Sequence, residues 1–189
     1  MLGGVLAGCA AFPTHYRDVP PDAWGPRAER LEAVRHWVLR GKISVQSEDE
    51  VWHGSIYWNQ RDEGYDVRVL GPLGQGAIRI TADGTSVKLE LARGEVYTAA
   101  DPDALLLAAT GLRIPLSGLT YWVRGLPRPG SVEHLRWDSG GRLAFLEQSG
   151  WQVDFLAYTR TSELDLPAKV ALQHGRVSVR LVVQRWTLT

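Results

Sequence analysis

The sequence predicts a mainly β fold: a large, strongly curved antiparallel sheet, rolled toward a barrel, with helices over its concave side. Three observations lead to this prediction. Apolar and polar residues alternate with a period of two in many segments, which is typical of half-buried strands. Turn signals such as Asp83-Gly84 and His174-Gly175 separate these segments. The alternation stops once, between Asp101 and Gly125, where the residues favour helices.

The chain begins with a short apolar stretch, MLGGVLAGCAA, which is far below the ~20 residues that span a bilayer. Within it, Leu6-Ala7-Gly8-Cys9 resembles the bacterial lipobox, in which cleavage leaves the cysteine at the new amino terminus with lipid on its sulfur and its amine. We expect residues 1–8 to be the remnant of a signal peptide and Cys9 to be lipidated. The alternative is an ordinary apolar leader in which Cys9 has no role.

Two further details bear on this leader. The positively charged segment that opens a signal peptide is missing, so we expect the true start to lie upstream. Cys9 is followed by Ala10 and not by the aspartate that tends to retain Gram-negative lipoproteins in the inner membrane, which implies the outer membrane. Because Cys9 is the only cysteine, an internal disulfide is excluded.

The next segment is expected to connect this amino terminus to one folded domain. From Thr14 to Pro26 the sequence is rich in proline and has no periodicity, so we predict a flexible tether over residues 9–26. Pro26 then precedes a run of helix formers that ends near Val34, which predicts a short amphipathic helix. The remaining length fits a single domain over residues 27–189.

Strands are predicted from Trp37 onward, where the period of two begins. The alternating residues are Leu39, Gly41, Ile43 and Val45; Trp52, Gly54, Ile56 and Trp58; Tyr65, Val67 and Val69; Ile78 and Ile80; Val87, Leu89 and Leu91; Trp151, Val153, Phe155 and Ala157; and Val177, Val179, Leu181 and Val183. Each set is expected to occupy one face of the sheet, because side chains two residues apart in a strand point the same way.

Two helices are predicted between the two groups of strands. Asp101 is a good N-cap, Pro102 suits the first helical position and Gly111 suits the end, so a capped helix is expected between them. A second short helix is expected from Leu116 to Val123. The first helix is too apolar to face water, and both helices can cover an open face of the sheet.

Charge and motifs exclude several classes of function. Lys plus Arg equals Asp plus Glu, 21 against 21, which argues against a protein that grips nucleic-acid phosphates. The five histidines are scattered without metal-ligand spacing, and the glycine-rich Gly71–Gly76 segment lies between strands and not before a helix. We therefore predict no catalytic residue, no metal and no cofactor. An enzyme that acts on lipids or cell-envelope material remains an alternative.

Two features of the sequence, its tryptophans and one apolar loop, have no role assigned so far. The eight tryptophans lie largely in or beside predicted strands and helices, where they either line a wide apolar space or simply belong to the core. The loop from Leu70 to Gly76 holds the apolar Leu73 at its tip. An exposed apolar tip is unfavourable in water unless it meets a partner or a membrane, and the alternative is that Leu73 folds back onto the sheet.

Taken together, the residues resemble the LolB family of outer-membrane lipoproteins, which receive other lipoproteins. The likeness covers nearly the whole chain and depends on the order and spacing of short pieces. These pieces are Trp37-x-Leu39-x-Gly41-Lys42-Ile43, Trp52-x-Gly54-x-Ile56-x-Trp58, Gly71-Pro72-Leu73-Gly74, Ile114-Pro115, Tyr121-Trp122-x-x-Gly125-x-Pro127, Gln148-x-Gly150-Trp151, Leu166-Pro167 and Arg185-Trp186-x-Leu188.

The resemblance implies a half-open, incomplete barrel with a helical lid over an apolar cavity. It implies that the cavity accepts the acyl chains of a lipoprotein from the periplasmic carrier LolA, and that the cargo enters the outer membrane without ATP. The protein is then a lipid-anchored monomer on the periplasmic face of that membrane. The loop with Pro72, Leu73 and Gly74 matches the one that delivers cargo to the membrane.

We predict the cavity lining from the lid helices and from strand parity, by which we mean that every second residue of a strand faces the same side of the sheet. The nominated residues are Ile43, Trp58, Val67, Val69, Ile78, Ile80, Leu106, Trp122, Trp151 and Phe155. A slip of one residue in register would move a whole set to the other face.

Two questions stay open at this level. The protein is alternatively a soluble periplasmic carrier or a general binder of hydrophobic ligands, which would need no lipid on Cys9. The surface that docks the carrier is not defined by a motif. Arg176, Arg180 and Arg185 form one candidate, and an ordinary solvated strand face is the other interpretation.

Overall fold

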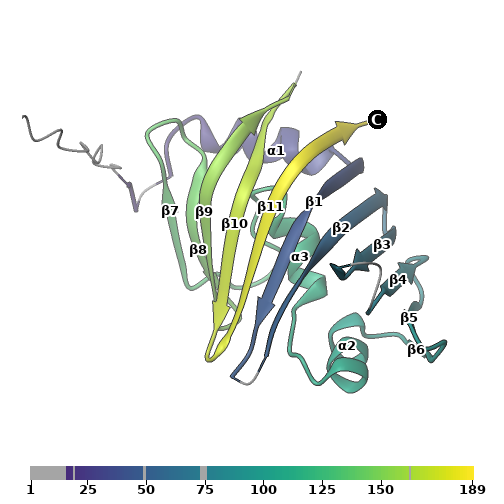
Figure 1. Ribbon diagram of the computed structural model, residues 1–189. Coiled ribbons are helices and arrows are strands. Elements are labelled where there is room, and N and C mark those ends of the chain that lie inside the picture. Colours follow the sequence, from purple (N-terminus) through teal and green to yellow (C-terminus); the bar gives the residue numbers. More distant parts are fainter. Residues whose placement is uncertain (1–15, 19, 49, 73–75, 162) are drawn as a thin grey trace, which may run out of the picture.

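The computed structural model describes residues 16–18, 20–48, 50–72, 76–161 and 163–189. Within this part of the chain, one 11-stranded antiparallel sheet has the order β6-β5-β4-β3-β2-β1-β11-β10-β9-β8-β7 (Figure 1). The edge strands β6 and β7 do not pair with each other, so the sheet is strongly curved but open. The predicted fold class, a half-open antiparallel sheet with helices over it, is confirmed.

The elements have the following bounds. The helices are α1 (Trp24–Ala33), α2 (Pro102–Thr110) and α3 (Leu116–Trp122). The strands are β1 (His36–Gln46), β2 (Val51–Arg61), β3 (Gly64–Leu70), β4 (Ile78–Ala82), β5 (Val87–Leu91), β6 (Val96–Ala99), β7 (His134–Trp137), β8 (Leu143–Gln148), β9 (Trp151–Arg160), β10 (Asp165–His174) and β11 (Val177–Leu188).

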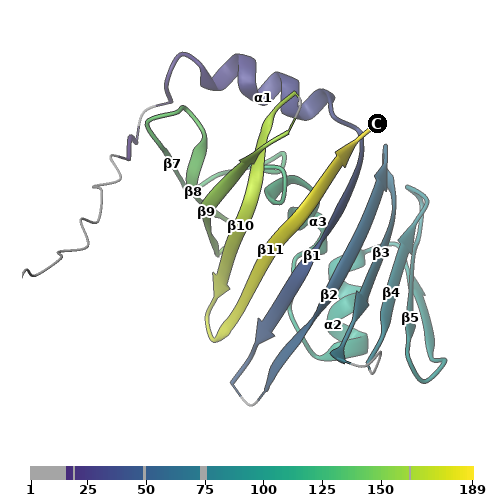
Figure 2. The ribbon, with the colours of Figure 1, turned by 45° about the horizontal axis from the view of Figure 1, so that its top comes forward.

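The first and last strands meet in the middle of the sheet. The chain runs outward from β1 to one edge at β6, forms α2 and α3, and returns from the other edge through β7 to β11. Strand β1 therefore pairs with both β2 and β11 (Figures 1 and 2). The ladder with β11 shifts register between Arg40 and Gly41. A Cβ atom on Gly41 would lie 2.3 Å from the carbonyl oxygen of Val182, so this close approach needs glycine.

The core lies between the concave face of the sheet and the helices α2 and α3, which cover that face (Figures 1 and 2). The predicted alternation holds, since Leu39, Trp58 and Leu89 are almost fully buried while their neighbours Arg40, Lys88 and Glu90 are exposed or half-buried. Burial of such side chains stabilises the fold by ~1.5–3 kcal/mol each. The outer face of the sheet carries the polar residues.

The sequence does not predict four of the strands, β6, β7, β8 and β10. In each of them the alternation of apolar and polar residues is interrupted or too short to recognise. In β10 the ladder with β9 is irregular at Pro167, which has no N–H to donate. In β8 the adjacent Leu143 and Ala144 are both buried, so apolar and polar residues do not alternate there. Strands β6 and β7 are short edges of four residues each.

The structured part of the chain begins earlier than the predicted boundary at residue 27. Helix α1 starts at Trp24, whose ring packs edge-on against Trp137 with centroids 5.8 Å apart. Before it, Arg17 and Trp137 exchange backbone hydrogen bonds of 2.9 Å in both directions. Residues 24–26 are thus helical rather than part of a tether, because Trp24 finds an apolar partner on β7.

Helix α2 has the ends that the sequence predicts. The carboxylate of Asp101 accepts hydrogen bonds from the backbone N–H groups of Asp103 and Ala104, at 2.9 and 3.3 Å. At the other end Gly111 has φ 72°, a left-handed conformation that favours glycine. Helix α3 ends at Trp122, one residue before the predicted end, so both predicted lid helices are confirmed as helices.

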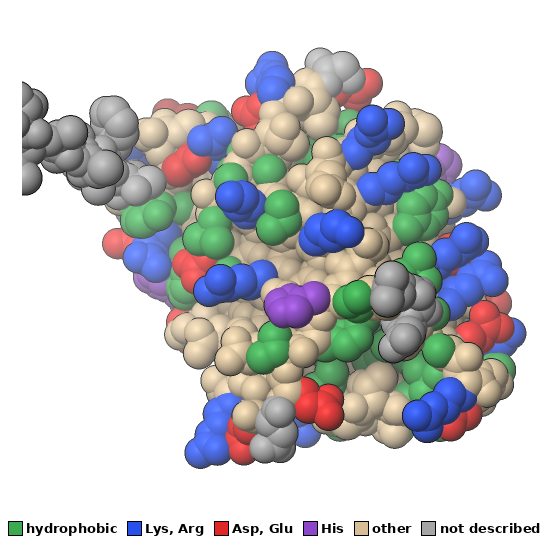
Figure 3. Space-filling view, viewed as in Figure 1, with side chains coloured by type: hydrophobic (Ala, Val, Ile, Leu, Met, Phe, Trp, Pro, Cys, Tyr) green, Lys and Arg blue, Asp and Glu red, His purple; other side chains and the backbone are tan. Residues whose placement is uncertain are grey.

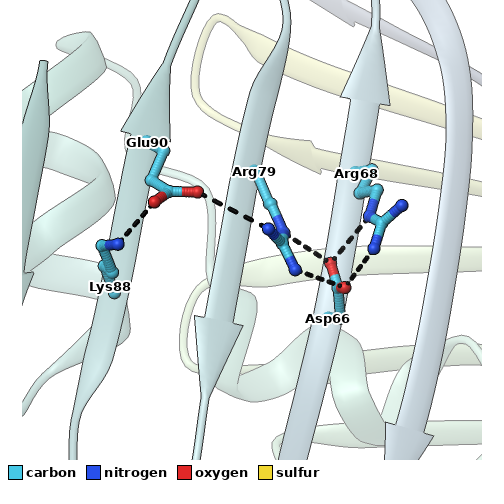
Figure 4. A network of polar contacts seen from close by, with 5 residues as sticks. All are labelled: Asp66, Arg68, Arg79, Lys88 and Glu90. Atoms are coloured by element: carbon cyan, nitrogen blue, oxygen red, sulfur yellow. Dashed lines mark hydrogen bonds and ion pairs between the residues drawn. The ribbon is translucent and has the colours of Figure 1, made fainter. Parts of the chain in front are cut away.

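On the outer face of β3, β4 and β5, charged side chains form a network (Figure 4). The carboxylate of Asp66 accepts from the guanidinium groups of Arg68 and Arg79, with shortest distances of 2.7 and 3.0 Å. Glu90 contacts Arg79 and accepts from Lys88. Hydrogen bonds from Arg68, and then from Arg79, lower the pKa of Asp66 to about 2. Each of these three cations is therefore paired with an acid.

The substitution Asp66→Asn is expected to lower the free energy of unfolding by up to ~1 kcal/mol at neutral pH, since the pairs are largely solvent-exposed. The folded pKa of Asp66 is depressed below the reference value of 3.8, so its contribution is present above about pH 4 and is lost as the pH falls toward about 2. Urea unfolding of both proteins across this range measures the difference. A difference that grows as the pH falls would contradict this assignment.

Candidate functional site

A hollow of about 190 Å³ lies between the concave face of the sheet and the lid formed by α2, α3 and the segment between them. Strands β1 to β4 supply one wall and the lid supplies the other. The lining residues are Ile43, Val45, Glu50, Trp52, Ile56, Trp58, Val67, Val69, Ile78, Ile80, Leu106, Thr110, Leu112, Ile114, Leu116 and Leu119.

Most of the nominated cavity residues are brought together here. Seven of the ten line the hollow, and they come from four strands and from α2. They are Ile43, Trp58, Val67, Val69, Ile78, Ile80 and Leu106. The cross-strand partners Val69 and Ile78, and likewise Val67 and Ile80, lie directly opposite each other on neighbouring strands.

The other three nominated residues, Trp122, Trp151 and Phe155, do not line the hollow. They lie in the core and are 1%, 3% and 7% exposed. The indole N–H of Trp122 donates to Gln148, and Trp151 packs between Trp122 and His174. Parity assigns a side chain to a face of the sheet, but packing of the lid decides which part of that face stays uncovered.

Several lining residues were not nominated. Val45, Trp52 and Ile56 belong to alternating sets that the sequence does reveal, so parity alone was enough to find them. Leu112 and Ile114 lie in the connection between α2 and α3, where no periodicity marks them. Only the fold brings that connection against the sheet.

The position of Trp52 depends on the glycine two residues further along β2. A Cβ atom on Gly54 would lie 2.2 Å from Cη2 of Trp52 and 2.6 Å from the carbonyl oxygen of Leu70. The Trp52 ring thus occupies the space beside Gly54 that a side chain would fill. This packing explains why tryptophan and glycine stand two residues apart in β2.

The chemistry of the lining is almost entirely that of hydrocarbon. Among the lining residues that the structure describes, Glu50 is the only charged one, and it is exposed at the rim. The Thr110 hydroxyl donates to the carbonyl oxygen of Leu106 and accepts from the N–H of Leu112, so its hydrogen bonds are made within the lid. The lining suits an apolar ligand.

Polar contacts join the two lid helices to each other and to helix α1. The carboxylate of Asp103 in α2 accepts from the backbone N–H and the hydroxyl of Ser117 in α3, at 2.9 and 2.5 Å. Beyond α3, the Arg124 guanidinium donates to the carbonyl oxygens of Leu31 and Val34 at the end of α1, and burial lowers its pKa. These contacts join α2 to α3 and the segment after α3 to α1.

Gln148 in β8 anchors the segment that follows α3. Its side chain is fully buried, and its oxygen accepts from Trp122 Nε1 and the N–H of Arg128, at 3.1 and 3.0 Å. Its nitrogen donates to the carbonyl oxygens of Arg128 and Ser131, at 2.8 and 3.1 Å. All four hydrogen bonds of the amide are made.

The remaining predicted site residues lie outside the residues that the structure describes or directly beside such a gap. Cys9, Leu73 and Gly74 lie outside the described residues, so their predicted roles stay predictions. Pro72 is exposed after the end of β3, and the neighbouring Leu70 is 47% exposed. In the described residues, no group of three or more His, Cys, Asp or Glu side chains is placed to hold a metal ion, and no helix is long and apolar enough to cross a membrane.

Solved structures that share little sequence identity with this chain have the same class of fold, an open, curved antiparallel sheet with helices over it. The LolA superfamily protein NE2245 from Nitrosomonas europaea aligns over 88% of this chain and 93% of its own, with a TM-score of 0.54 and 8% identity. A putative outer membrane lipoprotein-sorting protein domain from Vibrio parahaemolyticus aligns over 87% and 91%, with a TM-score of 0.51 and 9% identity. These likenesses concern the fold alone.

Sequence comparison narrows the class to a family. The family model described as outer membrane lipoprotein LolB matches residues 35–186. The outer-membrane lipoprotein LolB of Pseudomonas putida (strain W619) is 40% identical over 188 residues, which are 98% of this chain and 92% of the relative. That of Stutzerimonas stutzeri (strain A1501) is also 40% identical, over 98% and 91%. The chain belongs to the LolB family of outer-membrane lipoproteins, as the sequence motifs indicated.

Proposed function

We propose that this protein is an acceptor for lipoproteins, anchored through lipid on Cys9 to the periplasmic face of the outer membrane. It takes cargo from the periplasmic carrier LolA, holds the acyl chains in the hollow under the lid, and passes them to the membrane without ATP. The observation that carries this proposal is the apolar hollow, which has a single charged residue at its rim among the described lining residues. Family membership supports the same function.

The small volume of the hollow limits how cargo can enter it. Its 190 Å³ holds about six groups the size of a water molecule, each of ~30 Å³, which is less than one long acyl chain needs. The lid must therefore move away from the sheet to admit cargo.

Lid movement also explains how transfer runs without nucleotide hydrolysis. Acyl chains move toward the site that binds them best, so this site must bind them more tightly than the carrier and less tightly than the bilayer. Affinity for hydrocarbon scales with the apolar area that is buried, at ~25 cal/mol per Å². Opening the lid exposes Leu106, Leu116 and Leu119, and this cost keeps the affinity below that of the membrane.

A substitution at Leu73 is the most specific test of this function. By resemblance, the loop after β3 inserts cargo into the membrane, and an apolar tip is needed for that step. The substitution Leu73→Glu is expected to leave acceptance of cargo from the carrier unchanged and to reduce incorporation into membrane vesicles at least about tenfold. Separate assays of the two steps, with labelled lipoprotein, measure both effects.

The matched control is Ser139→Glu, which places the same charge at an exposed residue of the turn between β7 and β8. It is expected to leave both steps unchanged. Normal incorporation by the Leu73→Glu protein would contradict the role given to the loop. The soluble-carrier alternative is tested separately by the mass of the mature protein, because that alternative predicts a Cys9 without lipid.

A further inference from the structure

The outer face of the sheet carries a second group of cations, which form no ion pair among the residues that the structure describes. We call the five exposed residues Arg40, Lys42, Lys169, Arg180 and Arg185 the basic strip; they lie on the adjacent strands β1, β11 and β10. Figure 3 looks onto this face and shows Lys and Arg side chains gathered over these strands. None of the five pairs with a carboxylate in the described part of the chain.

This arrangement differs from the other half of the same face. On β3 to β5 the cations Arg68, Arg79 and Lys88 contact Asp66 or Glu90 (Figure 4). In the basic strip, by contrast, Arg40 of β1 lies directly across from Arg185 of β11. Like charges that face each other across a ladder are destabilising, so the strip gains stability when an anion binds.

A cleft of about 600 Å³ adjoins the strip at one end of the sheet. Lys42 and Arg180 lie on its polar side, together with Ser44, His53 and Ser55. The Lys42 ammonium donates to the Ser55 hydroxyl at 2.7 Å, which leaves two of its N–H groups for a ligand. The polar side of the cleft can therefore surround a phosphate group with donors.

The other side of the same cleft is apolar and open to water. Leu70 and Val182 line it and are 47% and 40% exposed, and Pro72 lies beside them. Ile43 of β1 belongs to the lining of both this cleft and the hollow under the lid, which lie on opposite faces of the sheet. A ligand that satisfies the cleft needs an anionic group next to hydrocarbon.

We propose that this cleft and the basic strip bind the phosphate groups of phospholipids and so hold the outer face of the sheet against an anionic membrane surface. A free phosphate would use the donors but leave the apolar side of the cleft uncovered, whereas a phospholipid covers both. The inference extends the proposed function, because it says how the acceptor orients on the membrane that receives cargo. Binding to lipid is nevertheless measurable without any cargo.

The test uses the full chain with Cys9→Ala, so that no lipid anchor contributes to binding. Sedimentation compares vesicles of phosphatidylcholine with vesicles of equal parts phosphatidylcholine and phosphatidylglycerol. We expect binding to the second vesicles only, weakening as salt is added. Each basic residue near such a surface contributes about fivefold in affinity, so the pair Lys42→Gln and Arg180→Gln should weaken binding about 25-fold.

The matched control is the pair Arg68→Gln and Arg79→Gln, which removes the same charge from the half of the face where each of these cations is paired with an acid. It should change binding by about twofold or less. Equal losses in the two pairs, or no binding to the anionic vesicles, would overturn the proposal. Displacement by soluble glycerol phosphate would show a site for free phosphate instead, and a loss only of cargo transfer from the carrier would show a docking site for protein.

The two proposals fail in different ways. If the hollow does not hold acyl chains, cargo transfer from the carrier is absent while vesicle binding is unaffected. If the basic strip does not bind lipid, vesicle binding is absent while the hollow, on the opposite face of the sheet, still accepts cargo.

Discussion

The substitution Ile78→Asp is expected to lower the affinity for acyl chains about 100-fold to 1000-fold at neutral pH. Ile78 is half-buried in β4 and lines the hollow beside Val69. In the empty hollow water still reaches this position, so the protein is expected to fold. Bound hydrocarbon would bury the new carboxylate without a partner, and protonating it at neutral pH costs ~4 kcal/mol.

Displacement of a fluorescent fatty acid measures this affinity. The loss should shrink below about pH 4, where an aspartate side chain is protonated. The control Leu156→Asp introduces the same charge on the exposed outer face of β9 and should bind the probe as the parent does. Unchanged affinity of the Ile78→Asp protein would mean that the hollow is not where acyl chains bind.

The second large effect is expected on stability, from Gln148→Leu. Leucine has a similar volume but makes no hydrogen bond, so Trp122, Arg128 and Ser131 would lose the partners that Gln148 now provides. An unsatisfied buried polar group costs ~1–3 kcal/mol. Because water can reach part of the Arg128 segment, we expect a net loss of ~3–5 kcal/mol, a large share of the 5–15 kcal/mol typical of a domain.

Urea unfolding measures this loss. Gln152→Leu is the matched control, since Gln152 is exposed on the neighbouring strand β9 and should change the free energy of unfolding by no more than ~0.5 kcal/mol. A loss below ~1 kcal/mol for Gln148→Leu would show that its hydrogen bonds do not hold the end of the lid in place.

The sequence predicts those parts of the fold that depend on local patterns. The cap of α2 needs only Asp101, Pro102 and Gly111, which lie within a few residues of the helix. The alternation in β1 and β2 is likewise visible residue by residue. Strand β10 was missed because Pro167 interrupts its ladder, and the buried pair Leu143 and Ala144 hid the period in β8.

The candidate site depends on contacts between distant segments, so it was predicted less completely. Parity finds the inward face, but it does not say that the lid leaves a hollow beside Val67 and packs Trp122 into the core. The arginines of β11 illustrate the same limit. Arg180 and Arg185 extend the outward face of β1, where Arg40 and Lys42 lie, whereas Arg176 pairs with Glu48 at the turns.

The central claim is that this protein accepts acyl chains from a carrier of lipoproteins. The most direct measurement mixes the protein with LolA that is loaded with a labelled lipoprotein, in the absence of ATP, and follows the label by affinity separation. We predict that the label moves to this protein and that Ile78→Asp prevents the movement while Leu156→Asp does not. Label that stays on the carrier, or that moves equally to the Ile78→Asp protein, would contradict the claim.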